Sequence, residues 1–276
     1  MPLRIVQSKH NSRLKELRRA LAQPTRGEPA GIEGPNLLDE AIRAGLHIHC
    51  VFASSENEAA AHERMLPSGT EVLLLPHDVL RSALTTETPQ PVAALIDPPA
   101  WTWEHLLRPR NNAASLLVVL AGLQDPGNLG AILRSAEAFG ATGVISLPGT
   151  VNAWNPKALR ASAGSVFRVP VIAANIADAF ARLRDSGIEV LVAAASAAVP
   201  ADRVRLAHPT AFLIGNEGNG VAEDIAVLAD GAISIPCPGP VESLNAAIAA
   251  SVLLYEASRQ RAIETGEDSS HRTEMR

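Results

Sequence analysis

Three short segments in the second half of the chain combine the residue types found in catalytic and binding loops. The first, QDPGNLGAILRS, contains Asn128 and Arg134 six residues apart. Its Asp-Pro-Gly-Asn turn precedes a helical pattern, so we expect Asn128 to cap a helix and Arg134 to lie about 9 Å further along the axis. A plain capped helix, with Arg134 paired to Glu137, explains this segment equally well.

The second segment, FLIGNEGNGV, runs from an apolar strand into a glycine-rich loop around Glu217. Glycines such as Gly215 allow the backbone to approach a ligand closely. The order G-x-G-x-x-G of dinucleotide-binding loops is absent, and the Glu217 carboxylate would repel a phosphate. A carboxylate beside such a loop suits a cationic ligand or a hydroxyl group better.

The third segment, ISIPCPGPVESLN, places prolines at positions 236, 238 and 240 between the strand end at Ile235 and a long apolar helix. Ser243 and Asn245 open this helix, and a capping role would account for Ser243. It would not account for the prolines, whose fixed φ makes a rigid loop suited to holding backbone groups around a ligand.

Continuous apolar strands alternate with helical segments in this half of the chain, which predicts an α/β fold with a parallel sheet flanked by helices. The expected strands are SLLVVLAG and the stretches near Val144–Leu147, Ile188–Ala194, Ala211–Gly215 and Ala232–Ile235. Ligands of parallel sheets bind beyond the carboxyl ends of the strands, where these loops lie.

The first part of the chain predicts a smaller α/β domain. Leu14, Leu17 and Leu21 follow helical spacing in a basic segment, a helix is expected from about Leu37 to Ala44, and strand patterns follow in HIHCVFA, EVLLLP and PVAALI. We expect this first domain at 1–107, a linker at 108–114, a second and larger domain at 115–263 and a flexible tail at 264–276.

Composition limits the function classes. The net charge of −5 argues mildly against a nucleic-acid partner, but the N-terminal stretch is basic. No apolar run is long enough for a membrane span, no secretory signal is present, and Cys50 and Cys237 lie far apart, so a reduced cytoplasmic protein is expected. His47 and His49 alternate on an expected strand, and ligand count and spacing both fail for a metal site, so no metal is expected.

Together, the spacings N-x5-R, GNEG-x-G and IP-x4-VESLN resemble the three motifs of the SpoU/TrmH family of RNA 2′-O-methyltransferases, in the SPOUT superfamily. The segment NPKALRASAGSVFRVPV is similar to the family's insert between the first two motifs. The resemblance covers about residues 116–261, and the first part resembles the family's ribosomal-protein-like substrate-binding domain.

The resemblance implies methylation of a ribose 2′-hydroxyl in RNA, with S-adenosylmethionine as cofactor. It also implies a SPOUT domain with a deep trefoil knot and a homodimer with active sites at the knot interface. Ribosomal RNA is favoured as substrate and transfer RNA is the alternative. The implied catalytic residues are Asn128, Arg134, Glu217, Ser243 and Asn245, the cofactor-binding residues are Gly215, Ile235 and Leu244, and the candidate RNA-binding residues are Lys9, Arg13, Arg18 and Arg160.

In this family the role of general base is often assigned to the arginine of the first motif, here Arg134. Because arginine stays protonated in proteins, we expect Arg134 instead to hold an RNA phosphate and stabilise the developing alkoxide. The proton acceptor is left open between a phosphate, water and Glu217. Two other readings also stay open: a dinucleotide-binding oxidoreductase, and a non-catalytic RNA-binding protein with the same fold.

Overall fold

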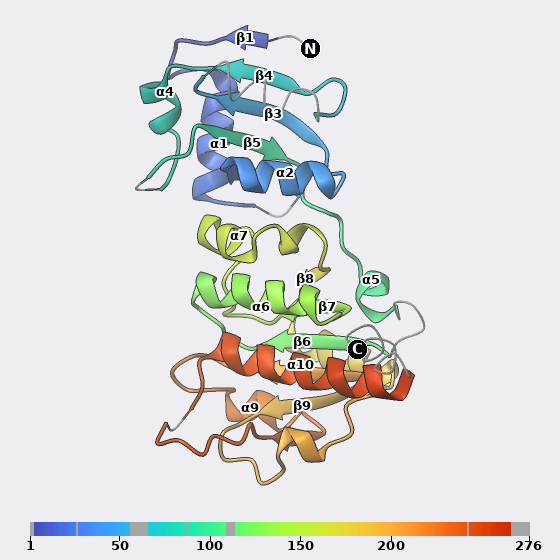
Figure 1. Cartoon of the computed structure of the whole chain (residues 1–276). Coiled ribbons are helices and arrows are strands. Elements are labelled where there is room, and N and C mark those ends of the chain that lie inside the picture. The colour runs from blue at the N-terminus through green and yellow to red at the C-terminus, as the bar shows by residue number, and fades with distance from the viewer. Residues whose placement is uncertain are drawn as a thin grey trace, which may run out of the picture. The chain divides into compact units, whose positions relative to one another are not determined.

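The computed structural model describes residues 3–25, 27–55, 66–86, 88–108, 114–241 and 243–265. The chain forms two compact units (Figure 1). Unit 1 comprises Met1–Ala100 and Asn152–Arg168, and unit 2 comprises Trp101–Val151 and Val169–Arg276. The segment Asn152–Arg168, with α7 (Pro156–Ser162) and a 3₁₀ turn (Ser165–Phe167), therefore packs with unit 1, although it lies inside the expected catalytic domain by sequence.

Unit 1 contains a mixed five-stranded sheet in the order β1-β4-β3-β5-β2, in which β5 is antiparallel to both of its neighbours. The strands are β1 (Leu3–Ile5), β2 (Ala30–Glu33), β3 (Ile48–Ala53), β4 (Glu71–Leu74) and β5 (Val92–Ile96). Besides α7, the helices in the described part of this unit are α1 (Ser12–Ala22), α2 (Pro35–Arg43) and α4 (His77–Arg81). The expected basic helix is confirmed as α1, whose apolar residues Leu14, Leu17 and Leu21 are buried.

Unit 2 contains a six-stranded, entirely parallel sheet in the order β11-β9-β10-β6-β7-β8. The strands are β6 (Leu116–Leu120), β7 (Gly143–Ser146), β8 (Val171–Ala173), β9 (Glu189–Ala193), β10 (Thr210–Ile214) and β11 (Gly231–Ile233). The helices are α5 (Trp103–Leu107), α6 (Pro126–Ala138), α8 (Ile176–Asp185), α9 (Glu223–Ala226) and α10 (Ala246–Thr265), with a 3₁₀ turn at Ala201–Arg203. The predicted parallel sheet flanked by helices is confirmed.

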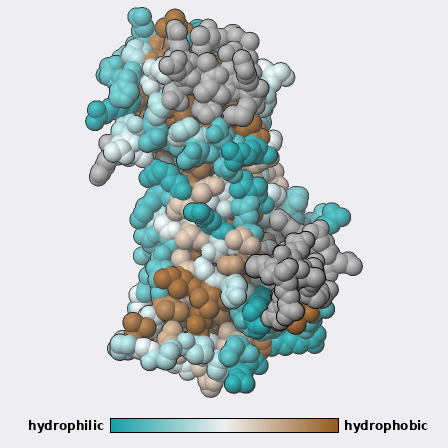
Figure 2. All heavy atoms as spheres, viewed as in Figure 1, coloured by the Kyte–Doolittle hydropathy of each residue, from teal (hydrophilic) through white to brown (hydrophobic). Residues whose placement is uncertain are grey.

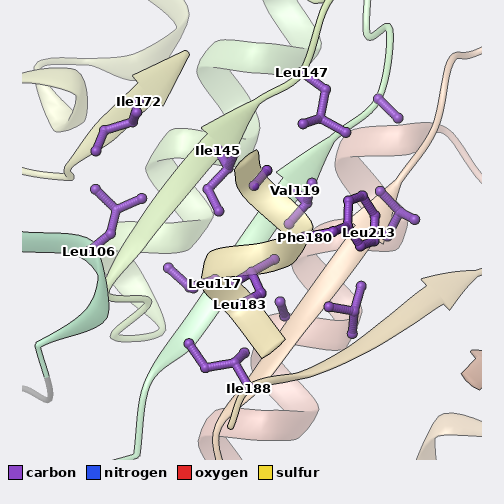
Figure 3. Close-up of a cluster of buried hydrophobic side chains, with 14 of the residues drawn as sticks. Leu106, Leu117, Val119, Ile145, Leu147, Ile172, Phe180, Leu183, Ile188 and Leu213 are labelled. Atoms are coloured by element: carbon purple, nitrogen blue, oxygen red, sulfur yellow. The ribbon is translucent and has the colours of Figure 1, made fainter. Parts of the chain in front are cut away.

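The central strands β6 and β10 are buried along their whole length, as their unbroken apolar sequences predict. Alternate residues of these strands, including Leu117, Val119 and Leu213, enter one apolar cluster (Figure 3). Phe180 and Leu183 of α8 pack into the same cluster. This core fixes the strands from whose carboxyl ends the candidate loops extend.

The stretch before β6 holds more structure than a linker. It includes α5, whose Leu106 is fully buried in the core cluster, and Trp101 and Trp103 pack against that cluster. Residues 109–113 of the expected linker and 266–276 of the expected tail lie outside the described residues. The domain boundaries therefore remain predictions.

Helix α10 is anchored near its C-terminal end by the half-buried guanidinium of Arg261. Arg261 donates hydrogen bonds to the carbonyl oxygens of Ala114, Ser115, Leu206 and His208 at 2.6–3.2 Å. Burial lowers the pKa of Arg261 to about 10, which still leaves the group charged at neutral pH. None of the helices in the described residues is both long and apolar enough to cross a membrane.

Candidate functional site

The first two candidate loops lie side by side because their strands are neighbours. β6 pairs with β10 in parallel, and Ala121, just after β6, donates its N–H to the carbonyl of Ile214 at 2.9 Å. The strand order also reverses here: β7 and β8 extend the sheet on one side of β6, while β10, β9 and β11 lie on the other. Such a reversal is where open parallel sheets bind ligands.

Glu217 joins these two loops. Its carboxylate accepts hydrogen bonds from the backbone N–H of Asp125 at 3.1 Å, the backbone N–H of Gln124 at 3.4 Å and the side-chain Nδ2 of Asn128 at 2.9 Å. Partial burial acts to raise the pKa of Glu217, but these hydrogen bonds outweigh it and hold the pKa below its ordinary value. The carboxylate is therefore ionised at neutral pH.

Asn128 extends the network to the third loop. Because an ionised carboxylate only accepts hydrogen bonds, Asn128 directs Nδ2 to Glu217, and its Oδ1 accepts from Nδ2 of Asn245 at 3.0 Å. The Oδ1 of Asn245 accepts from the N–H groups of Ala247 at 2.9 Å and Ile248 at 3.3 Å, in the first turn of α10. Three of the predicted catalytic residues thus form one hydrogen-bonded chain across three loops.

Two expected helix caps are wrong. Asp125, not Asn128, caps α6, since its side chain accepts from the N–H of Asn128 at 2.9 Å and Pro126 occupies the first helical turn. Asn245, not Ser243, provides the side-chain cap of α10. Asn128 is consequently released from capping, and its amide is available to the network.

The glycine-rich loop is closed by its own backbone. Asn216 and Gly220 exchange two backbone hydrogen bonds, at 2.8 and 3.0 Å, and Nδ2 of Asn216 donates to the carbonyl of Gly122 at 2.9 Å. A Cβ on Gly215 would lie 2.1 Å from the carbonyl carbon of Gly220 and 2.2 Å from the nitrogen of Val221. Gly215 is therefore required by the turn that presents Glu217, a steric reason distinct from direct ligand contact.

The proline-rich loop leaves its backbone groups free. Within the parts of the chain that the structure describes, residues 235–241 make no backbone hydrogen bond. Ile235 and Leu244 are half-buried, while Cys237 and Ser243 are exposed, and Ser243 forms no hydrogen bond to a described residue. Free N–H and C=O groups on a stiff loop can bind the edge of a heterocyclic base.

Arg134 lies apart from the network. Arg134 follows Asn128 by six helical residues, so the two side chains point in directions roughly 120° apart around the helix axis. Arg134 is exposed and makes no hydrogen bond or ion pair with any residue in the described ranges. An unengaged guanidinium at the surface is free to meet an anion.

The candidate RNA-binding residues in α1 and in the segment just before it are less available to bind RNA than the sequence alone indicates. Lys9 lies 3.6 Å from Asp78, and Arg13 lies within 3.3 Å of both Glu16 and Glu71. Arg18 is half-buried, and its one hydrogen bond to a described residue is a long contact of 3.5 Å with Ser82. In α7, Arg160 is also exposed. The roles of all four remain predictions.

Sequence reasoning missed two residues that organise the site. Asp125 orders the first loop, and Asn216 ties the glycine-rich loop to the end of β6. A sequence signal existed for Asp125, because a proline at the first helical position makes the preceding residue the cap. No comparable signal marked Asn216, whose contact with Gly122 spans 94 residues.

Comparison with known proteins places this chain in a family. Residues 115–255 match the SpoU rRNA Methylase family, and residues 11–94 match the MRM3-like substrate binding domain. The chain is 29% identical over 252 residues to the 23S rRNA (guanosine(2553)-2'-O)-methyltransferase RlmP of Bacillus subtilis (strain 168), covering 91% of this chain and 97% of that protein. It is 33% identical over 265 residues to the uncharacterized tRNA/rRNA methyltransferase of Mycobacterium ulcerans (strain Agy99), covering 88% of this chain and 83% of that protein.

Among solved structures, the SpoU methyltransferase AviRb from Streptomyces viridochromogenes in complex with AdoMet is similar at a TM-score of 0.81. The sequences are 29% identical, and the match covers 91% of this chain and 98% of that one. The resemblance inferred from the three motifs is thereby confirmed. The chain belongs to the SpoU rRNA methylase family.

Proposed function

We propose that the protein transfers a methyl group from S-adenosylmethionine to a ribose 2′-hydroxyl in ribosomal RNA. One observation carries the proposal: Glu217, Asn128 and Asn245 form a continuous hydrogen-bonded chain across the three loops at the carboxyl edge of the sheet. A reading as a dinucleotide-binding oxidoreductase lacks support, because the carboxylate at this edge would repel a pyrophosphate.

The residues present fit the cofactor. The free backbone groups of residues 235–241 are suited to hydrogen bonding with an adenine edge, and the ionised Glu217 favours a site for a cationic group. We assign cofactor binding to Gly215, Ile235 and Leu244, as the family motifs imply. The bound cofactor supplies a methyl group made electrophilic by a positive sulfonium.

The chain's own residues orient the ribose. Asn128 and Asn245 hold each other in fixed orientations, and this preorganisation lowers the cost of placing a hydroxyl in line with the methyl group. Ser243 is exposed beside them and is available to contact the ribose. Arg134 would hold an RNA phosphate and stabilise negative charge developing on the 2′-oxygen. The proton then passes to a phosphate, to water or to Glu217.

A second copy of the chain is the proposed partner for one face of α10. Ile248, Val252 and Tyr255, at helical spacing, are 53%, 39% and 54% exposed, and apolar surface gathers over this helix (Figure 2). An apolar stripe of this kind on a helix is typical of a protein interface. We therefore propose a homodimer through α10, and from family membership a deep trefoil knot in unit 2.

Light scattering during size-exclusion chromatography tests the dimer. Val252→Arg should convert a dimer to a monomer, because it places a charge at the centre of the apolar stripe. Val227→Arg is the matched control, since Val227 is also an exposed valine of unit 2, at 70%, but lies at the end of α9. A monomeric wild-type protein would contradict the proposal.

Ribosomal RNA in the cytoplasm is the proposed substrate, on the strength of the named activity of the Bacillus subtilis relative. Ribose-methylation mapping of total RNA from cells with and without the protein tests this directly. We expect one ribosomal site to lose its methyl group when the protein is absent. Loss of a transfer-RNA site would overturn the substrate, and no lost site would favour a non-catalytic RNA-binding protein.

A further inference from the structure

Unit 1 carries a cluster of two histidines and one carboxylate, whereas the loops described above belong to unit 2. The Nδ1 of His47 lies 2.9 Å from Oδ2 of Asp97, and the Nε2 of His49 lies 2.6 Å from Oδ1 of the same residue. The three side chains can present one ligand atom each, all within 4.8 Å of one another. The sequence places His47 and His49 together but gives no sign of Asp97, 48 residues further on.

An irregularity in the sheet brings the three groups to one place. β3 and β5 are antiparallel, and the pairing register shifts between Ile48 and Cys50, so that His49 is the extra residue of a bulge. Bulges re-aim side chains at the edge of regular pairing. Asp97 follows β5 directly and donates its N–H to the carbonyl of His47 at 2.9 Å, which fixes the carboxylate opposite both rings.

The ligand chemistry favours a borderline transition metal. Imidazole nitrogens and a carboxylate are the ligands of zinc sites that keep a fourth position for water. Metal–ligand distances of about 2.0–2.2 Å require ligand atoms about 3.4 Å apart, which small side-chain rotations of these groups would reach. Partial burial acts to raise the pKa of Asp97, but hydrogen bonds from His49 and His47 hold it below its ordinary value, so the carboxylate is charged.

We propose that His47, His49 and Asp97 form a binding site for Zn²⁺ or a divalent ion of the same class. The ion would link the start of β3 to the end of β5 and fix the point at which the chain leaves the sheet of unit 1. A water molecule would complete a tetrahedral shell on the exposed side, where His47 is 64% exposed.

The test uses the full-length protein without an affinity tag, stripped with a chelator and titrated with zinc chloride by calorimetry. We expect one ion per chain, and visible absorption bands of tetrahedral Co²⁺ when cobalt replaces zinc. His47→Ala and Asp97→Asn should each weaken binding by at least about tenfold. Circular dichroism checks that the variants fold. Because His47 is exposed, its substitution is expected to disturb the fold less than that of Asp97.

The matched control is His208→Ala. His208 Nε2 lies 2.6 Å from Oε2 of Glu189, so this pair has the same histidine–carboxylate contact without a second histidine. Zinc binding should be unchanged in this control. Zinc binding by the wild type that is no tighter than by His47→Ala would overturn the proposal, as would equal losses in His208→Ala.

Discussion

Gly215→Ala should displace the loop that carries Glu217, although it adds a single methyl group. The added carbon would lie 2.1 Å from the carbonyl carbon of Gly220, and both groups that it meets are backbone. No side-chain rotation can relieve this contact. The peptide between Gly220 and Val221 must therefore retreat by more than about 1 Å to reach normal van der Waals separation.

The expected cost follows from that displacement. Overpacking of this kind costs about 1–3 kcal/mol, and it strains the two hydrogen bonds between Asn216 and Gly220. A shift of about 1 Å at a catalytic group can lower the rate by about 10²-fold. We expect a lower Tm, at least about tenfold weaker S-adenosylmethionine binding, and a larger loss in methyl transfer.

Calorimetric cofactor binding, thermal unfolding and methyl transfer to ribosomal RNA measure these effects. Gly218→Ala is the matched control, because its Cβ would meet only Oδ1 of Asn216, at an ordinary 3.4 Å. The control should bind cofactor as the wild type does. If Gly215→Ala has the Tm of the wild type and binds S-adenosylmethionine as tightly, the steric account of this loop is refuted.

Four further outcomes are expected. Asn128→Asp should lower methyl transfer at least about tenfold, because it sets a second carboxylate against Glu217; Glu217→Gln in the same chain should recover part of the loss, and no recovery would argue against direct coupling. Arg134→Ala should abolish methyl transfer while leaving cofactor affinity and Tm unchanged, since the exposed side chain has no partner among the described residues; a large loss of cofactor binding would contradict its role. The hydrogen bonds that lower the pKa of Glu217 stabilise the fold above the ordinary pKa of this group, 4.5, and this stabilisation is lost as the pH falls through the lower pKa of the folded state. Any difference in the free energy of unfolding between wild type and Glu217→Gln should therefore shrink below about pH 4.5 and stay constant above it. Arg261→Lys should lower the free energy of unfolding by about 1.5–3 kcal/mol in urea titrations, because an ammonium cannot reach all four carbonyl oxygens; an unchanged midpoint would refute the anchoring role.

The architecture of unit 2 could be predicted because burial on both faces leaves a continuous apolar signature in β6 and β10. The motif loops could be recognised because they follow those strands. Local competition was harder to resolve: Asp125 and Asn128 are both good capping residues, and only the position of Pro126 decides between them.

Contacts between distant residues could not be predicted from one sequence. The basic residues of the N-terminal segment meet Glu71 and Asp78, which only the fold of unit 1 brings near. Asp97 reaches His47 and His49 through strand pairing and a bulge, and neither leaves a sequence pattern. The position of Arg134 off the network likewise depends on helix phase and on which residue begins the helix.

The hydrogen-bonded chain of Glu217, Asn128 and Asn245 affects when, during synthesis, the catalytic site is complete. Asn128 lies 89 residues from Glu217 and 117 from Asn245, so the site closes across most of unit 2. During synthesis, the substrate-binding unit and the glycine-rich loop leave the ribosome before α10 does. An incomplete chain therefore lacks Asn245, and the proposed methyl transfer begins only when α10 docks and delivers this residue.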